Sequence, residues 1–247
     1  MHDVVGYRAK WGVIIPSTGT VVEHDFNLLA PPGVTVHTGR AYIGKPAMST
    51  NEEAKSVLDQ MEESFDIALR DILTLLPDQI VIAMSAEIMR RGVEGGAAYV
   101  DAIAQRSGLP VVTAPRACEA ALHTLGVKHI AILTPYQPMS DKLTADYFSA
   151  LGFDVVAVKG LRCASATAIA EVQPPALVEA LKEVDTPEAE AIVQVGTNLS
   201  MVRLAAEAER WLGKPTICMN AATVWHALRE AGIKDQFPHF GTLFENY

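Results

Sequence analysis

Residues 78–85 (DQIVIAMS) have a counterpart in residues 189–196 (AEAIVQVG). Two further pairs recur in the same order: residues 12–17 (GVIIPS) match residues 131–136 (AILTPY), and residues 108–115 (GLPVVTAP) match residues 213–220 (GKPTICMN). Each segment is a short apolar run that leads into a turn of small residues. A repeat of this kind predicts two similar α/β halves whose equivalent loops face one another across a cleft.

Eight short runs rich in valine and isoleucine are expected to be strands. They span residues 11–16, 34–43, 79–84, 110–114, 129–134, 153–158, 191–195 and 215–219. Strands that are buried on both faces of a parallel sheet are apolar without strict alternation, as these runs are. Helical patterns separate them. The sequence therefore predicts an α/β fold of two similar halves, each a mostly parallel sheet flanked by helices.

Three of the expected helices have recognisable starts. Thr50 and Glu53 have the spacing of a capping box, and so do Thr20 and Glu23. The pair Thr186-Pro187 is typical of an N-cap followed by proline at the first helical position. After Thr50, apolar residues recur at helical spacing, which predicts a long amphipathic helix.

The order of the repeat divides the chain into two halves that are not both continuous. The first half is expected to comprise residues 1–115 and a C-terminal segment of about 221–247, and the second half residues 116–220. Ligands of parallel α/β sheets bind beyond the carboxyl ends of the strands. The candidate site therefore lies where the strand-end turns of the two halves meet.

Composition excludes several classes of function. The chain has 247 residues, 49% of them hydrophobic, which is enough for one large or two modest domains. Its net charge of −9 speaks against a nucleic-acid partner, which needs a clustered basic face. We expect no membrane span and no signal peptide. The three cysteines form no CxxC pair, a pattern that favours the reducing cytoplasm over a disulfide framework.

Several short sequence motifs at the expected strand ends resemble those of one known family. They are Ile15-Pro16-Ser17-Thr18, residues 36–40 (VHTGR), Thr134-Pro135-Tyr136, Thr197-Asn198-Leu199, Gly213-Lys214-Pro215 and residues 220–228 (NAATVWHAL). In this order they resemble the maleate isomerase and arylmalonate decarboxylase branch of the aspartate/glutamate racemase superfamily, and the likeness covers essentially the whole chain. The resemblance implies a pseudo-twofold pair of α/β domains with the active site between them.

The same resemblance implies chemistry by cysteine, which this chain lacks at the matching positions. In isomerase and racemase members a cysteine stands at the strand end of each half, and the decarboxylases keep only the second one as an acid. Ser85 and Gly196 occupy those two positions here. A thiol is readily lowered in pKa into the working range, whereas an unassisted serine hydroxyl is not. We therefore expect non-cysteine chemistry.

The first half supplies seven candidate residues. Ser85 is a candidate nucleophile or carboxylate donor, with helix capping as the alternative, and Ala86 follows it as a candidate contact. Glu87 is a candidate general base, although an acidic residue is also favourable in a first helical turn. The remaining candidates are the substrate-binding residues of the first strand-end turn, Pro16, Ser17, Thr18 and Gly19. Maleate isomerases have asparagine in place of Gly19.

The second half supplies four candidates. The turn of Gly196, Thr197 and Asn198 can point backbone N–H groups at an anion, with capping by Thr197 as the alternative. The resemblance implies that this turn binds a carboxylate or enediolate oxygen. It also matches Tyr136 to a carboxylate-binding tyrosine, for which a half-buried packing role is the alternative.

Taken together, the residues predict a cofactor-independent enzyme that acts on a small carboxylic acid, with Ser85, Glu87 and Tyr136 as catalytic candidates. No phosphate loop and no third ligand beside His226 and Glu230 is present, so we expect neither a nucleotide cofactor nor a metal. A serine-dependent hydrolase that uses Ser85 and a non-catalytic carboxylate-binding protein stay open as alternatives. So does association into a homo-oligomer.

Overall fold

The computed structural model describes residues 3–247 and contains two four-stranded sheets. The first has the order β2-β1-β3-β4 and the second the order β6-β5-β7-β8, with every neighbouring pair parallel. The strands are β1 (Ala9–Pro16), β2 (Val34–Ala41), β3 (Gln79–Ile82), β4 (Val111–Thr113), β5 (His129–Thr134), β6 (Asp154–Gly160), β7 (Ala191–Gln194) and β8 (Thr216–Cys218). The eight expected strands and the α/β fold of two similar halves are confirmed.

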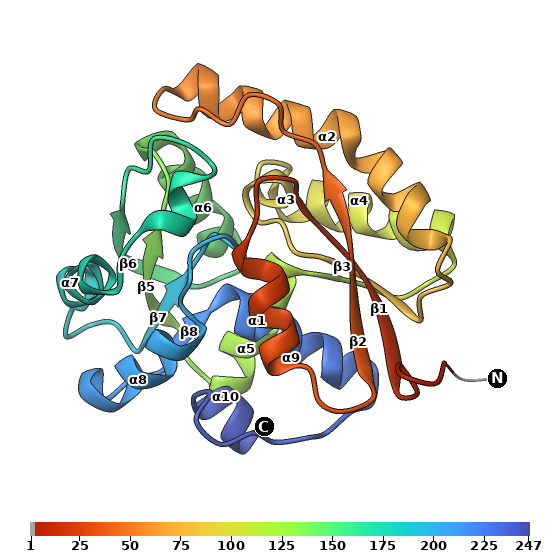
Figure 1. Cartoon of the computed structure of the whole chain (residues 1–247). Helices are drawn as coiled ribbons and strands as arrows, with labels where there is room; N and C mark the ends of the chain where they lie inside the picture. The colour runs from red at the N-terminus through yellow and green to blue at the C-terminus, as the bar shows by residue number, and fades with distance from the viewer. Residues whose placement is uncertain (1–2) are drawn as a thin grey trace.

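Helices surround and separate the sheets. They are α1 (Val21–Leu29), α2 (Asn51–Leu73), α3 (Ala86–Met89), α4 (Gly92–Ser107), α5 (Ala114–Leu125), α6 (Pro138–Ala150), α7 (Pro174–Val184), α8 (Val202–Leu212), α9 (Met219–Glu230) and α10 (Thr242–Asn246), with a 3-10 turn at Ala168–Glu171. Figure 1 shows β1, β2 and β3 on one side of the molecule and β5 to β8 on the other. No helix among residues 3–247 combines the length and the apolar character needed to cross a membrane.

The central strands β1 and β3 of the first sheet are buried on both faces, as their unbroken apolar runs predict, whereas the edge strand β2 is partly exposed. Val13 and Ile15 of β1 belong to the large core that extends into the second half of the chain. Ile14, between them, points to a second core formed with α2, which includes Phe65 and Leu69. Successive side chains of a strand point to opposite faces, so one strand contributes to both cores.

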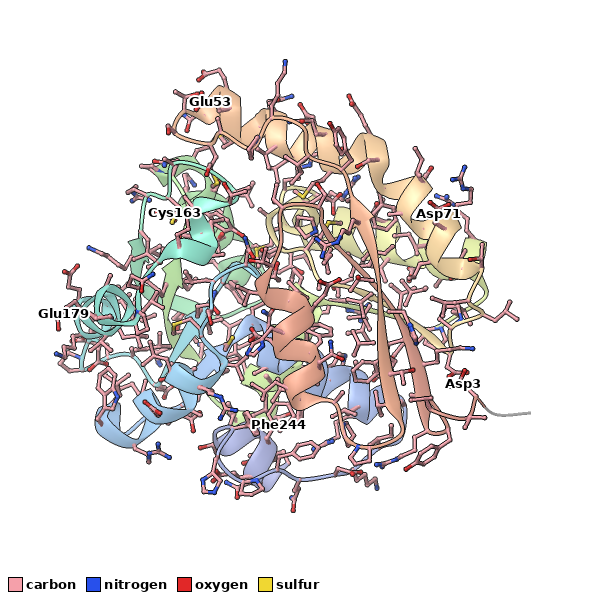
Figure 2. All side chains as sticks on the ribbon, in the orientation of Figure 1. Asp3, Glu53, Asp71, Cys163, Glu179 and Phe244 are labelled. Atoms are coloured by element: carbon pink, nitrogen blue, oxygen red, sulfur yellow. The ribbon has the colours of Figure 1, made fainter. Side chains whose placement is uncertain are left out.

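Packing and a short stretch of backbone pairing are among the contacts that join the two halves. Helix α5 packs on α9, and α1 also packs on α9. The segment before α2 reaches the second half, where Ala47 and Ser165 form an antiparallel bridge and Met48 N–H donates to the Ala164 carbonyl. Figure 2 shows Glu53, at the start of α2, above Cys163 of the second half.

The sheets lie within residues 9–113 and 129–218, but the exact division of the chain stays a prediction. Residues 1–115 with about 221–247, and residues 116–220, were expected as the two halves. Because α5 and α9 pack on each other between the sheets, their assignment to one half or the other is not decided by contacts.

One of the three expected helix starts is present as predicted. Thr50 and Glu53 form the reciprocal capping box of α2. Thr20 precedes α1, but its side chain does not cap the helix, and Glu23 bonds Arg40 and Thr38 instead of completing a capping box. Thr186-Pro187 opens no helix, since only a few residues separate it from β7 and the chain makes a turn there.

This difference between the two threonines gives a test of the fold. Thr50→Ala removes a real cap and should lower the free energy of unfolding by about 0.5–2 kcal/mol. Thr20→Ala removes an exposed hydroxyl that caps nothing and should change it by less than about 0.5 kcal/mol. Urea unfolding followed by circular dichroism measures both. Equal losses for the two variants would contradict this assignment of the caps.

Candidate functional site

A buried hydrogen bond links the two halves at their strand ends. Ser85 stands between β3 and the short helix α3, and Tyr136 lies two residues after β5. The Ser85 Oγ and Tyr136 Oη atoms are 2.7 Å apart, and both side chains are buried. Two hydroxyls from strand-end loops of different halves therefore form one pair.

The backbone of Tyr136 is held in place by its neighbours. Its N–H donates to Thr134 Oγ1 at 3.0 Å, and its carbonyl accepts from the Arg162 guanidinium at 2.6 Å. Asp141 in turn accepts from both Thr134 and Arg162. This set of bonds fixes the direction in which the phenol points.

Burial determines the protonation state of the phenol. Loss of solvent raises the pKa of Tyr136 to about 12, and the hydrogen bond with Ser85 offsets only part of that rise. The phenol is therefore protonated at neutral pH and can donate a hydrogen bond. It is not available there as a base.

Gly196 occupies a backbone position that excludes a side chain. Its φ is +108°, and a Cβ atom would lie 2.7 Å from Pro135 Cδ and 3.5 Å from Tyr136 Oη. Other residues rarely adopt this conformation. The glycine thus lets the second-half turn pack directly against Pro135, next to Tyr136.

Side-chain amides hold the carbonyl groups of this turn. Gln194 Nε2 donates to the Gly196 carbonyl and Asn220 Nδ2 to the Thr197 carbonyl, both at 2.8 Å. Within residues 3–247, the N–H groups of Gly196, Thr197 and Asn198 donate to no protein acceptor. A row of free donors with fixed carbonyls is suited to an anionic oxygen.

These groups line a cavity of about 80 Å³. Its polar end carries the hydroxyls of Thr18, Ser85, Tyr136, Ser140 and Thr197. Those of Thr18, Ser140 and Thr197 form no hydrogen bond within residues 3–247. No lysine, arginine or histidine of the described residues lines the cavity. An anion bound here would be held by neutral donors.

The opposite wall is apolar. It is built from the segment before α2, from α2 itself and from the loop after β6, and comprises Ile43, Met48, Ala54, Val57, Leu58, Met61, Ala166 and Ile169. Met84 and Ala86 extend it from the first half. The lining therefore combines hydroxyl and N–H donors suited to an oxyanion with an apolar surface suited to a hydrophobic group.

The structure brings eight of the eleven sequence candidates to this cavity. They are Pro16, Thr18, Ser85, Ala86, Tyr136, Gly196, Thr197 and Asn198. Ser17 does not line it, because its Oγ accepts from Ile43 N–H at 2.9 Å, and Gly19 packs on Pro16 and Asn198. Asn198 lines the cavity, but its side-chain amide is already occupied by protein partners.

Glu87 lies away from the cavity. Its carboxylate pairs with Arg91 at 3.0 Å, and Arg91 also bonds Glu62 of α2 and stacks over the Tyr99 ring. Burial raises the pKa of Glu87, and the Arg91 pair lowers it in part. The geometry thus gives Glu87 a role in attaching α2 to α3 and places no substrate beside it.

Cysteine is also absent from the cavity wall. Cys118, Cys163 and Cys218 are all buried, free thiols, and none of them lines the cavity. Burial raises the pKa of each thiol, so none is a ready thiolate. No cluster of potential metal ligands occurs in the described part of the chain.

Sequence reasoning missed the apolar wall. Val57 and Met61 have the helical spacing that marks a buried face, but that spacing does not say whether the face covers core or cavity.

Comparisons with known proteins agree with this architecture. A family model described as arylmalonate decarboxylase matches residues 56–244. Maleate isomerase of Geobacillus stearothermophilus is 25% identical and covers 94% of this chain and 95% of its own length. Arylmalonate decarboxylase of Bordetella bronchiseptica is 27% identical over 63% of this chain and 66% of its own. The structure of Nocardia farcinica maleate cis-trans isomerase bound to TRIS shares the fold, with a TM-score of 0.88 at 21% identity, over 96% of this chain and 97% of that one.

Close packing around Gly196 leads to a stability prediction. Gly196→Ala should lower the free energy of unfolding by about 2–5 kcal/mol, because the new Cβ meets Pro135 in a disfavoured conformation. Gly213→Ala is the matched control: its φ is +71°, but a Cβ there meets nothing within 4 Å. It should cost about 1–2 kcal/mol. Urea unfolding decides, and a Gly196 variant no worse than the control would contradict the close approach.

A buried acid beside the turn gives a prediction for pH. Burial raises the pKa of Asp25 to about 6 from 3.8, and the hydrogen bond from Asn220 Nδ2 offsets part of the rise. Because the pKa of Asp25 is raised in the folded state, its contribution to the free energy of unfolding is fully present below about pH 4 and is lost as pH rises through 6. The free energy of unfolding of Asp25→Asn should therefore rise relative to that of the wild type as pH increases between those values, by up to about 3 kcal/mol.

The Asp25 test is a pair of unfolding curves at pH 4, 5, 6, 7 and 8. Other titrating groups contribute equally to both proteins, so the difference in unfolding free energy isolates Asp25. A difference that stays constant across this range would refute the assignment.

Proposed function

This chain belongs to the arylmalonate decarboxylase family and is an isomerase- or decarboxylase-like enzyme, and we propose that it decarboxylates a small malonate-type acid without a thiol or a cofactor. The observation that carries the proposal is the buried Ser85–Tyr136 hydroxyl pair at the end of a cavity that no cysteine lines. The substrate we propose has two carboxylates on one carbon and an apolar substituent on the same carbon.

The two ends of the cavity favour this substrate over maleate. A carboxylate that is taken out of water needs hydrogen-bond partners, and the polar end supplies them. The two carboxylates of maleate lie on the same side of its double bond and maleate carries no apolar substituent, so nothing in it would fill the wall of Val57, Met61 and Ile169. An aryl or alkyl substituent fits that wall, and its burial contributes to binding.

Neutral donors can stabilise the charge that decarboxylation creates. When the bond from the α carbon to one carboxylate breaks, its electron pair stays on the α carbon and spreads into the remaining carboxylate as an enediolate. The free N–H groups of the Gly196–Asn198 turn can donate to the enediolate oxygens, while the single O–H proton of Tyr136 is directed to Ser85. Donors fixed before the reaction commonly supply the largest catalytic contribution.

The hydroxyl pair supplies the proton that completes the reaction. Ser85 donates its proton to the α carbon and takes one from Tyr136 across their 2.7 Å hydrogen bond. The enediolate carbon is much more basic than a phenolate, so a phenol with a pKa of about 12 is acidic enough. Water then returns a proton to Tyr136.

The hydrolase alternative lacks a base. A serine nucleophile needs a proton acceptor within hydrogen-bond reach. Among residues 3–247, the side-chain partner of Ser85 Oγ is the Tyr136 hydroxyl, which is itself protonated at neutral pH. Glu87 is directed to Arg91. We therefore place the hydrolase below the decarboxylase, and leave the non-catalytic carboxylate-binding protein to experiment.

The test offers phenylmalonate and maleate to the purified protein and follows both by NMR. We expect phenylacetate and carbon dioxide from phenylmalonate, and no fumarate from maleate, because no thiolate meets the alkene. Fumarate at about 1–1000 turnovers per second, the ordinary range of enzymes, would refute thiol-free decarboxylation as the function. Binding of phenylacetate with no turnover of phenylmalonate would identify a binding protein instead.

Substitution of the hydroxyl pair tests the mechanism. Tyr136→Phe and Ser85→Ala should each lower kcat for phenylmalonate by about 10²–10³, the loss found when one such donor is removed. Tyr42→Phe, at an exposed tyrosine outside the cavity, is the matched control and should leave kcat unchanged. Wild-type kcat in either site variant would contradict the proposed proton path.

A further inference from the structure

Helix α1 of the first half is capped by a side chain from the second half. Asn198 Oδ1 accepts from Thr20 N–H at 2.9 Å and from Val21 N–H at 3.3 Å. The first N–H groups of a helix have no partner within the helix, and a side-chain oxygen at this place normally comes from the residue just before it. Here that residue, Thr20, makes no capping bond.

The other end of the same amide is also used. Asn198 Nδ2 donates to the Ala166 carbonyl at 3.0 Å, in the loop that follows β6. Both halves of the amide are therefore satisfied, and the side chain is only 7% exposed. The donors at one end and the acceptor at the other leave a single consistent orientation of the amide.

All three joined segments form walls of the cavity. Pro16 and Thr18 belong to the turn that leads into α1, Ala166 and Ile169 to the loop after β6, and Asn198 to the second-half turn. One buried side chain thus joins two segments of the cavity wall that are far apart in sequence.

We propose that Asn198 is a positioning residue, which fixes the distance between the Pro16–Thr18 wall and the Ala166–Ile169 wall by capping α1 from the opposite half of the molecule. Its side chain does not contact the substrate, in contrast to the substrate-binding role that the sequence suggested. The part of this inference that concerns catalysis rests on the proposed function. The structural part does not: the Asn198 side chain holds the start of α1 and the Ala166 carbonyl together, and we call this pair of contacts the clamp.

Three variants separate the two ends of the clamp. Asn198→Ala removes both ends. Asn198→Asp keeps an oxygen for Thr20 and Val21 but replaces the donor to Ala166 with a second acceptor. Thr20→Ala is the matched control at the capped residue. Gly213→Ala controls for general loss of stability, because it lies outside the cavity wall.

Amide hydrogen exchange on the ligand-free protein reads the clamp directly. In Asn198→Ala, we expect exchange at Thr20 and Val21 to accelerate about two- to thirty-fold, the factor that corresponds to loss of a helix cap. Residues 164–169 should also accelerate. In Asn198→Asp, the amides of Thr20 and Val21 should stay protected from exchange, whereas those of residues 164–169 should not. Both controls should leave both sites unchanged.

Phenylacetate affinity, measured by calorimetry, and phenylmalonate kinetics then test whether the clamp serves the cavity. Asn198→Ala should weaken phenylacetate binding and lower kcat/KM for phenylmalonate by about ten-fold, as expected for the loss of such hydrogen bonds. Asn198→Asp should recover part of the affinity. The controls should bind as the wild type does.

Two results would overturn the proposal. One is unchanged exchange at Thr20 and Val21 in Asn198→Ala, which would show that Asn198 does not cap α1. The other is accelerated exchange with unchanged phenylacetate affinity, which would make the cap irrelevant to the cavity. A wild-type protein that binds no phenylacetate would count against the proposed function, while exchange at the two sites would still decide the clamp.

Discussion

The cavity depends on side-chain hydrogen bonds that cross between two sheets with no strand in common. Each sheet is stable through its own parallel ladder, but the loops at its carboxyl ends must be held against those of the other sheet. The Ser85–Tyr136 bond and the Asn198 amide make this connection beside the cavity. The packing of α5 on α9 sets the sheets roughly, and these buried polar contacts set the loops finely.

The electrostatics of the cavity depend on neutral donors. The chain carries a net charge of −9, and no cationic side chain of residues 3–247 lines the cavity. Binding of an acid therefore relies on N–H and O–H dipoles, which act over short distances and are strong only where water is excluded. Burial keeps Tyr136 protonated and so keeps it a donor. The same burial makes the turn intolerant of misplacement, which is why its carbonyls are bonded to Gln194 and Asn220.

Much of this architecture could be predicted from sequence, because it follows from patterns that act locally. Apolar runs such as residues 129–134 and 191–195 specify buried parallel strands, and the repeat brings Ser85 and Gly196 to one cavity. The cap of α1 could not be predicted, since the local rule favoured Thr20 and the actual acceptor, Asn198, lies 178 residues away. The apolar wall was missed for a similar reason: the face of α2 that carries Val57 and Met61 has the same pattern whether it covers a core or a ligand. Glu87 lies in the first turn of α3, as the rule for acidic residues at helix starts allows, and pairs with Arg91.

The most direct test of the central claim is a crystal structure of the protein with phenylacetate bound. The account predicts the carboxylate within hydrogen-bond distance of the Gly196–Asn198 N–H groups, with the ring against Val57, Met61 and Ile169. Phenylacetate bound with its ring toward Ser85 and its carboxylate toward α2, or bound outside this cavity, would contradict it.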